Sequence, residues 1–338
     1  MALKVFLGSV TQLAVFREKY YPLSSHSYSG FAGMSVKLVE APNKSRFPFS
    51  NCLLIERGPL RVLVDTGCTP NEPPGSFDAV VYTHFHPDHI RGCEWAVSRA
   101  RKIFAPEGEK PYRSLSDLAV RFAPGMEDSW LAMASSIGLS CVPKVDEYYR
   151  PGEDLCVGSI CIKTYPARGH LLTHNLIEAY NILHLVDIDL TGFGPWYANP
   201  EADPSTFLAD IEAAATIKVS RYVTAHKQGY LDRSDAVRSL AGYAKRLVEQ
   251  AEAVHKALSS SEAPLKPRDL TGRGLIYRRY LPGFENIMGY FEASMIEKLL
   301  GLLYIWGCTR REREGWVASD CDLQNIKESV AERILSYM

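Results

Sequence analysis

The sequence predicts an α+β protein in which helices flank two mixed or antiparallel β-sheets. Strand-forming and helix-forming stretches alternate along most of the 338 residues, as in folds that pack helices on sheets. Hairpin signals also join neighbouring strands, and a single doubly wound parallel sheet would not produce them. The apolar share of 46% and the charged share of 23% are ordinary for a globular chain.

The first half of the chain begins with β-rich runs and then turns helical. The segment LLIERGPLRVLVD at 53–65 is typical of a hairpin whose turn contains Gly58 and Pro59. The continuous apolar run DAVVYT at 78–83 predicts a strand buried on both faces. After Asp88 the apolar residues recur at helical spacing. Further elements expected in this half are a strand at RKIFAPE and helices near 112–121 and 127–137.

The second half continues the alternation and ends in a smaller region. The stretches EDLCVGSICIKTYPA, YNILHLVDIDL and RYVTAHK predict strands. The linker candidate is LSSSEAPLKPRDL, which is rich in serine, proline and charge. Helices are expected at about 204–217, 233–258 and 289–305 and from about 321, with the charged turn TRRERE before the last one. We therefore expect an N-terminal extension at 1–32 packed on the core, a main domain at 33–260 and a mostly helical C-terminal region at 261–338.

Charge and cysteine content bear on partners and location. A net charge of −1 and a pI of about 6.8 give no reason to expect nucleic acid or an anionic membrane as the main partner. No apolar run approaches the roughly 20 residues that span a bilayer, and MALKVFLGSVTQLAVF resembles strands more than a signal peptide. The eight cysteines contain no CxxC pair. We interpret them as mostly buried free thiols, which favours a soluble protein in the reducing cytoplasm.

Three histidines and an aspartate follow the apolar strand DAVVYT almost at once: His84, His86, Asp88 and His89. Neutral imidazoles suit zinc and other divalent first-row metals, and a carboxylate adds compensating charge. In an extended stretch His84 and His86 share a face and can hold one ion. Asp88 and His89 lie past a proline, where the chain turns, and could face a second ion. The alternative is a surface loop with fortuitous histidines, which four ligand-type residues after a buried strand argue against.

The stretch THFHPDHIRG resembles the HxHxDH signature of the metallo-β-lactamase superfamily. Other motifs of that family occur in the expected order: VLVDTG with Asp65, YPARGHLLTH with Gly169 and His170, the acidic strand end LHLVDIDL, and YVTAHK with His226. The resemblance covers roughly residues 33–230, and the ordered set is far more specific than any one motif. It implies an αββα sandwich of two mixed β-sheets flanked by helices.

The resemblance also implies two divalent metal ions, with zinc as the first choice and iron or manganese as alternatives. The ligand positions fall on two sets of residues here: His84, His86 and His170 for one ion, and Asp88, His89 and His226 for the other. The bridging aspartate would be Asp187 or Asp189. Asp187 is preferred because it directly ends the apolar run ILHLV. Asp65 would orient a loop or a ligand histidine.

Asp88 and His174 are two of three candidates for a direct role in catalysis. Asp88 belongs to the HxHxDH motif itself. His174 follows His170 by four residues, where some lactonases and phosphotriesterases of the superfamily also have a histidine. For His174, a role in the pocket or in supporting a metal ligand and a merely structural role both stay open. His184 lies within an apolar strand, and we interpret it as a hydrogen-bonded core histidine.

The third candidate is Tyr197, in the aromatic stretch IDLTGFGPWYANP. We expect this stretch, with Phe193 and Trp196, to form a wall of the substrate pocket in which Tyr197 hydrogen-bonds a substrate oxygen. The alternative is an aromatic cluster packed for stability. An aromatic wall favours a neutral or apolar substrate.

The resemblance implies a binuclear metal-dependent hydrolase in which a metal-bridging hydroxide cleaves an ester-type bond, in a phosphotriester, phosphodiester, lactone or carboxyl ester. A glyoxalase-type thiolester hydrolase, an RNA-processing nuclease and an iron-dependent redox enzyme of the same superfamily are the alternatives. We expect a small-molecule ester-type substrate, and neither nucleic acid nor a membrane as partner. The apolar helix MIEKLLGLLYIWG is either deeply packed or an interface, which leaves a homo-oligomer open.

Overall fold

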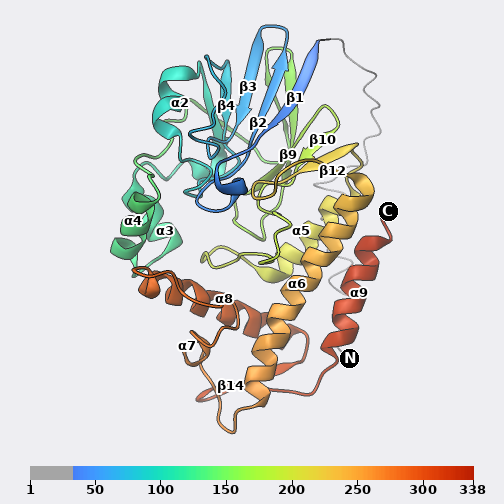
Figure 1. Cartoon of the computed structure of the whole chain (residues 1–338). Helices are drawn as coiled ribbons and strands as arrows, with labels where there is room; N and C mark the ends of the chain where they lie inside the picture. The colour runs from blue at the N-terminus through green and yellow to red at the C-terminus, as the bar shows by residue number, and fades with distance from the viewer. Residues whose placement is uncertain (1–32) are drawn as a thin grey trace.

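Two six-stranded β-sheets form the centre of the protein, with helices flanking them (Figure 1). This computed structural model describes residues 33–338, and the extension predicted at 1–32 lies outside the described residues. The strand order is β1-β2-β3-β4-β5-β6 in one sheet and β12-β11-β10-β9-β8-β7 in the other. Both sheets contain parallel and antiparallel pairs, which confirms the predicted α+β fold of two mixed sheets.

The first sheet starts with three antiparallel strands and continues with parallel ones. The predicted hairpin is β2 and β3, and its turn places Gly58 at a φ of 56°, which glycine adopts without a steric cost. The strands of this sheet are β1 (Met34–Val39), β2 (Cys52–Arg57), β3 (Leu60–Val64), β4 (Ala79–Val81), β5 (Ile103–Pro106) and β6 (Glu147–Tyr149).

The second sheet is antiparallel except where β10 pairs with β11. The stretch expected as one strand, EDLCVGSICIKTYPA, is the hairpin of β7 and β8. The strands of this sheet are β7 (Asp154–Val157), β8 (Ile160–Pro166), β9 (Asn175–Ala179), β10 (Ile182–His184), β11 (Arg221–Val223) and β12 (Leu231–Asp232).

Alternate residues of the strands face two different hydrophobic clusters. In β2, Leu53 and Ile55 lie in the cluster between the sheets, whereas Cys52 and Leu54 face the helices. The cluster between the sheets takes side chains from both, including Ile160 of β8. Strands with both faces buried need apolar residues at successive positions, which explains the continuous apolar runs in the sequence.

The helices cover the outer faces of the sandwich. Figure 1 places α2, α3 and α4 on one side of the molecule and α5, α6 and α9 on the other. These helices are α2 (Cys93–Arg99), α3 (Leu115–Phe122), α4 (Glu127–Ser136), α5 (Pro204–Thr216), α6 (Arg233–Ser259) and α9 (Leu323–Leu335). Short 3-10 turns also occur at Asn43–Ser45 and Glu107–Glu109.

The C-terminal region packs closely on the rest of the chain. After the short α7 (Pro267–Leu270), α8 (Glu285–Ile305) crosses beneath the sheets, and α9 lies beside α6 (Figure 1). The apolar side of α8 is deeply packed, with Met295 and Leu299 fully buried. The segment expected as a charged turn instead forms a hairpin of β13 (Thr309–Glu312) and β14 (Gly315–Ala318). No helix between residues 33 and 338 is long and apolar enough to cross a bilayer.

The eight cysteines form four disulfides: Cys52–Cys68, Cys93–Cys141, Cys156–Cys161 and Cys308–Cys321. The prediction of free thiols is therefore wrong, and the argument from thiols for a reducing cytoplasm no longer holds. No CxxC spacing marked these pairs. The fold alone brings the partners together, for example by pairing Cys156 opposite Cys161 in the hairpin of β7 and β8.

Candidate metal centre

The predicted ligands lie where strands of both sheets end. His84, His86, Asp88 and His89 follow β4 of the first sheet. The remaining three follow β8, β10 and β11 of the second sheet, respectively His170, Asp187 and His226. Because these strand ends meet at one edge of the sandwich, residues far apart in the sequence come together there.

The seven side chains form two adjoining sets, each able to hold a metal ion: His84, His86, His170 and Asp187, and Asp88, His89 and His226. Within each set the ligand atoms lie within 4.8 Å of one another. This is the grouping that the family resemblance implies, and Asp187 lies with the first set.

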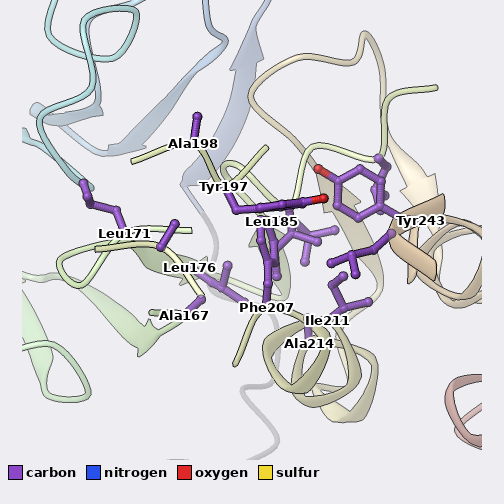
Figure 2. Close-up of a cluster of buried hydrophobic side chains, with 14 of the residues drawn as sticks. Ala167, Leu171, Leu176, Leu185, Tyr197, Ala198, Phe207, Ile211, Ala214 and Tyr243 are labelled. Carbon is purple, nitrogen blue, oxygen red and sulfur yellow. The ribbon is translucent and has the colours of Figure 1, made fainter. Parts of the chain in front are cut away.

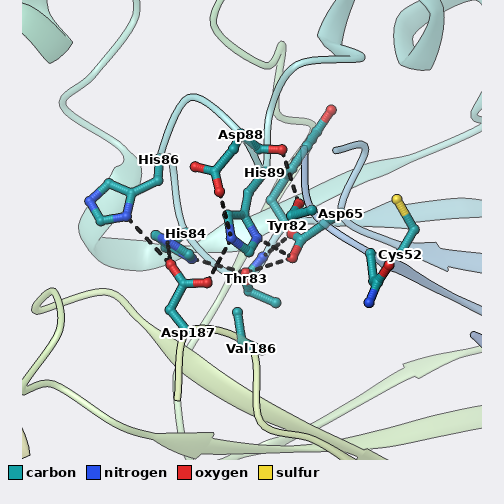
Figure 3. Close-up of polar contacts among 12 residues, drawn as sticks. Cys52, Asp65, Tyr82, Thr83, His84, His86, Asp88, His89, Val186 and Asp187 are labelled. Carbon is teal, nitrogen blue, oxygen red and sulfur yellow. Dashed lines mark hydrogen bonds and ion pairs between the residues drawn. The ribbon is translucent and has the colours of Figure 1, made fainter. Parts of the chain in front are cut away.

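Asp187 stands between the two sets, with one carboxylate oxygen toward each (Figure 3). Its Oδ2 lies 3.3 Å from His84 Nε2 and 2.9 Å from His170 Nε2. Its Oδ1 lies 2.9 Å from His89 Nε2 and 3.6 Å from His226 Nε2. Asp189, the other candidate, accepts a hydrogen bond from the backbone N–H of Thr191 at 2.9 Å. Asp187 is therefore the candidate that lies between the two sets.

Three of the histidines are oriented through the ring nitrogen that faces away from the ligand sets. Their Nδ1 atoms contact oxygen acceptors: His89 with Asp65 Oδ2 at 2.8 Å, His170 with the Trp196 carbonyl at 2.9 Å, and His226 with the Ser45 carbonyl at 2.9 Å. Such contacts place the proton on Nδ1 and turn Nε2 toward a metal ion.

Asp65 holds the start of the histidine loop as well as His89. It ends β3 with a φ of 59°, a left-handed conformation that aspartate tolerates better than most residues. Its two oxygens accept hydrogen bonds from the backbone N–H and the hydroxyl of Thr83, both at 2.8 Å (Figure 3). The predicted orienting role of Asp65 fits this geometry.

Gly169 lets the loop that carries His170 approach helix α5. A Cβ at this glycine would lie 2.2 Å from the backbone N and Cα of Phe207. The backbone N–H of Gly169 donates to Asp210 Oδ2 at 2.7 Å, and Asp210 belongs to the same helix. Only glycine fits at this point, and the position of His170 depends on it.

The electrostatics of the two sets differ. Burial lowers the pKa of His84 well below its ordinary value and that of His86 to about 4, so both rings are neutral. Burial also opposes the charge on His89 and His226, but nearby carboxylates outweigh it. They raise the pKa of His89 well above its ordinary value, and that of His226 to about 9. A metal ion that binds these last two rings must displace protons.

The donor chemistry fits divalent metal ions. His84 Nε2 is buried and makes no hydrogen bond within the described part of the chain, a costly arrangement that a metal ion would relieve. His86 Nδ1 and His170 Nε2 lie 2.8 Å apart, as two nitrogens that share one ion can do. Imidazoles with carboxylates suit zinc and other first-row metals, and the donor set does not select one of them.

Two of the predicted catalytic residues lie outside the site. The prediction that Tyr197 bonds the substrate is wrong, because its ring is fully buried and its hydroxyl donates to Gln250 Oε1 at 2.8 Å. Figure 2 shows Tyr197 in a cluster of buried apolar side chains that includes Phe207. His174 is also fully buried, so of the two roles expected for it near the site it does not line the pocket, and it instead supports a ligand. Its Nδ1 donates to the Ala167 carbonyl at 2.8 Å, and its Nε2 accepts from the backbone N–H of Asp187 at 3.1 Å.

His174 therefore positions the bridging aspartate and does not contact a substrate. His184 is the buried core histidine that the sequence predicts, and its Nδ1 accepts from the backbone N–H of Val186 at 3.2 Å. Asp88 lines the cavity beside His226, with 3.1 Å between its Oδ2 and the histidine Nε2. A catalytic role for Asp88 remains a prediction.

A cavity of about 1010 Å³ opens onto both ligand sets. Phe193 and Trp196 line it, as expected for the aromatic stretch, and Trp196 Nε1 donates to the hydroxyl of Tyr277 at 2.7 Å. The C-terminal region also contributes Tyr277 and Phe291 to the lining. Sequence reasoning missed Asn199, whose side-chain amide lies 2.7 Å from His86 Nε2. An asparagine in a loop carries no signal for that contact.

The histidine loop and the segment before it match a known family. A family model of the metallo-beta-lactamase superfamily matches residues 46–114, which contain Asp65 and the HxHxDH motif. Residues 46–114 are therefore similar to the metallo-β-lactamase superfamily. No curated protein matches it.

Solved structures with the metallo-β-lactamase fold share the architecture of this chain. A metallo-beta-lactamase family protein from Thermus thermophilus is 16% identical, with a TM-score of 0.63 over 86% of this chain and 99% of its own. A beta-lactamase domain protein from Burkholderia ambifaria is also 16% identical, with a TM-score of 0.60 over 90% of this chain and 100% of its own. At these identities the likeness establishes the fold and leaves the reaction open.

Proposed function

We propose that this protein is a metal-dependent hydrolase that cleaves an ester-type bond in a small molecule. It would hold two divalent metal ions, with zinc as the first choice. The observation that carries the proposal is the position of Asp187, whose two oxygens face two separate ligand sets at the floor of one cavity. An isolated structural metal site would be closed and would need only one set.

The ions would supply the central chemistry, because a pair of divalent metals lowers the pKa of water and stabilises negative charge on oxygen. The chain supplies the positions. Asp187 sets the relation between the two ligand sets, and Asp65 and the carbonyls of Ser45 and Trp196 fix the rings. The apolar side chains around the cavity exclude water and so strengthen the charge interactions within it.

The bond that is cleaved can be a carboxyl ester, a lactone or a phosphoester, since the same ions serve each of them. The thiolester alternative is tested by the thiolester in the panel below, and the nuclease alternative requires a different surface. A nuclease needs basic surface for phosphates, and this chain carries a net charge of −1. An iron-dependent redox enzyme would use the same ligand types, so metal analysis and oxygen dependence separate it from a hydrolase.

The test is a hydrolysis panel on protein of measured metal content. The panel contains a lactone, a carboxyl ester, a phosphodiester, a phosphotriester, a thiolester and a β-lactam. We expect turnover of at least one carboxyl ester, lactone or phosphoester with zinc, iron or manganese bound. His226→Ala should lose most of it, because the second set loses a ligand.

His255→Ala is the matched control, since His255 lies on α6 and contacts the Ser319 carbonyl at 3.0 Å, outside the ligand sets. Its activity should equal that of the wild type. The proposal fails if no substrate turns over with any of the metals, or if His226→Ala retains full activity.

A further inference from the structure

We propose that the substrate is amphipathic, with an anionic group on one side of the scissile bond and a bulky apolar group on the other. This inference rests on the hydrolase function proposed above. The inference follows from a cavity whose two ends differ in character. Aromatic side chains contact histidines of the first ligand set, and three cationic side chains lie in the segments next to His226 of the second set.

The apolar end of the cavity is built from three separate parts of the chain. The ring of Phe122, at the end of α3, lies 5.0 Å from the ring of His86. Trp196 lies 5.8 Å from His86 and 6.1 Å from His170, and it packs on Phe291 of α8 at 5.5 Å. Met133 of α4 also lines the cavity. Such a lining selects an alkyl chain or a ring system by burying its surface.

The cationic end consists of Lys44, Arg46 and Lys227, all of which line the cavity. Lys227 directly follows His226, and Lys44 and Arg46 flank Ser45, whose carbonyl contacts His226 Nδ1 at 2.9 Å. None of these three cationic side chains forms an ion pair within residues 33–338. The cations therefore face the cavity without a protein anion to neutralise them.

Both cationic segments are held by one buried side chain, Asn51. Its Oδ1 accepts from the backbone N–H of Ala41 at 3.0 Å and from the hydroxyl of Ser45. Its amide donates to the carbonyls of Thr224 at 3.0 Å and Lys227 at 2.8 Å. Asn51 is fully buried, so these bonds fix the two segments relative to each other.

The backbone of the first cationic segment is strained. Asn43, Lys44 and Ser45 have successive φ values of 53°, 55° and 61°, which lie in the left-handed region. This conformation is sterically unfavourable for a residue that carries a Cβ. Strain of this kind persists only where surrounding bonds enforce it, and it is concentrated at ligand-binding sites. Here the strained segment carries Lys44 into the lining beside His226.

The charge balance of the site favours an anion. The carboxylates that line the cavity are Asp88, Asp187 and Asp189, and two divalent ions would outweigh their charge. Lys44, Arg46 and Lys227 then add positive charge at one end. Such a cavity attracts anions and orients them toward that end. An apolar group on the same molecule would point the other way, with the bond to be cleaved over the ligand sets.

The experiment compares esters that differ only in charge. One pair is 4-(decanoyloxy)benzoate and 4-(decanoyloxy)benzamide, and a second pair reverses the ester as decyl 4-carboxybenzoate and decyl 4-carbamoylbenzoate. For the metal-loaded wild type we expect the carboxylate of at least one pair to have a kcat/KM about tenfold above its carboxamide. The two-carbon analogue of the preferred ester, 4-acetoxybenzoate or ethyl 4-carboxybenzoate, should be cleaved at least tenfold less efficiently.

The triple variant Lys44→Ala, Arg46→Ala, Lys227→Ala should abolish the preference by raising KM for the carboxylate only. Lys218→Ala, which removes an exposed lysine outside the cavity, is the control and should leave the preference intact. Binding of the uncleavable ethers 4-(decyloxy)benzoate and 4-(decyloxy)benzamide, measured by calorimetry, should show the same order without any turnover.

The two proposals fail in different ways. If esters are cleaved but charge and chain length make no difference, or the triple variant keeps the preference, the amphipathic substrate is refuted while the hydrolase stands. If neither these esters nor any substrate of the hydrolysis panel is cleaved, the hydrolase is refuted. Calorimetry then decides separately whether the cavity selects amphipathic anions, and equal affinity for the two ethers refutes that as well.

Discussion

Replacing Gly169 by alanine should damage both the fold and the metal centre. The new Cβ would lie 2.2 Å from backbone atoms of Phe207, so a side chain cannot simply turn away to make room. Either α5 or the loop before His170 must move by about 1 Å or more to reach an ordinary contact distance. The second movement takes His170 away from Asp187, which lies 2.9 Å from its Nε2.

The magnitude follows from two contributions. Overpacking of a buried site costs about 1–3 kcal/mol. The bond from the Gly169 N–H to Asp210 is stretched by the same movement, and an unsatisfied buried partner costs about 1–3 kcal/mol more. Gly169→Ala should therefore lower the free energy of unfolding by about 2–6 kcal/mol, and the protein should bind less metal.

Urea unfolding of the metal-free protein measures the first effect, and elemental analysis after zinc loading measures the second. Gly242→Ala is the matched control, because Gly242 lies exposed on α6 with nothing within 4 Å of the added Cβ. It should gain up to about 1 kcal/mol from the helix propensity of alanine. If Gly169→Ala is as stable as the wild type and binds as much zinc, the packing argument is refuted.

Three further predictions follow from the buried polar groups and the cysteines. Tyr197→Phe should lower the free energy of unfolding by about 1–2 kcal/mol, because Gln250 Oε1 loses its hydrogen-bond donor, and it should leave kcat unchanged. A variant that keeps full stability but loses kcat would instead indicate that Tyr197 contacts the substrate. Burial raises the pKa of Asp210 to about 8, so this carboxyl is protonated when folded and ionised when unfolded between about pH 4 and 8. Its contribution to stability should fall by about 1.4 kcal/mol per pH unit over that window, and Asp210→Asn should remove this slope in pH-dependent urea unfolding; an unchanged slope contradicts the assignment. Thiol titration of the unfolded, unreduced protein should detect no free thiol, and eight after reduction, whereas several thiols before reduction would count against the disulfides.

The histidine cluster could be predicted from the sequence because it follows a strand with a strong apolar signal, and the family resemblance added His170, Asp187 and His226. His84 and Asp187 directly follow such runs, and the ends of neighbouring strands meet at one edge. The choice of Asp187 over Asp189 rested on the same argument, and the structure places Asp187 between the sets. The two mixed sheets were predictable for a related reason, since hairpins and strand–helix alternation leave local patterns.

Features that depend on tertiary contact could not be predicted. An aromatic loop does not reveal which ring faces a cavity, so Trp196 and Tyr197 could not be told apart. The Ser45 carbonyl that orients His226 belongs to the backbone and leaves no residue signal. The cysteine pairs join segments up to 48 residues apart. The helical spacing of Val97 predicts that it lies on the buried face of α2, yet this residue is 45% exposed.

The most direct test of the account is the number of metal ions that the folded chain binds. Elemental analysis of zinc-loaded, desalted protein should give two ions per chain for the wild type and about one for His226→Ala, because only the second ligand set loses a member. A wild type that holds no more than one ion, or a His226→Ala variant that still holds two, would contradict the assignment of two ligand sets bridged by Asp187.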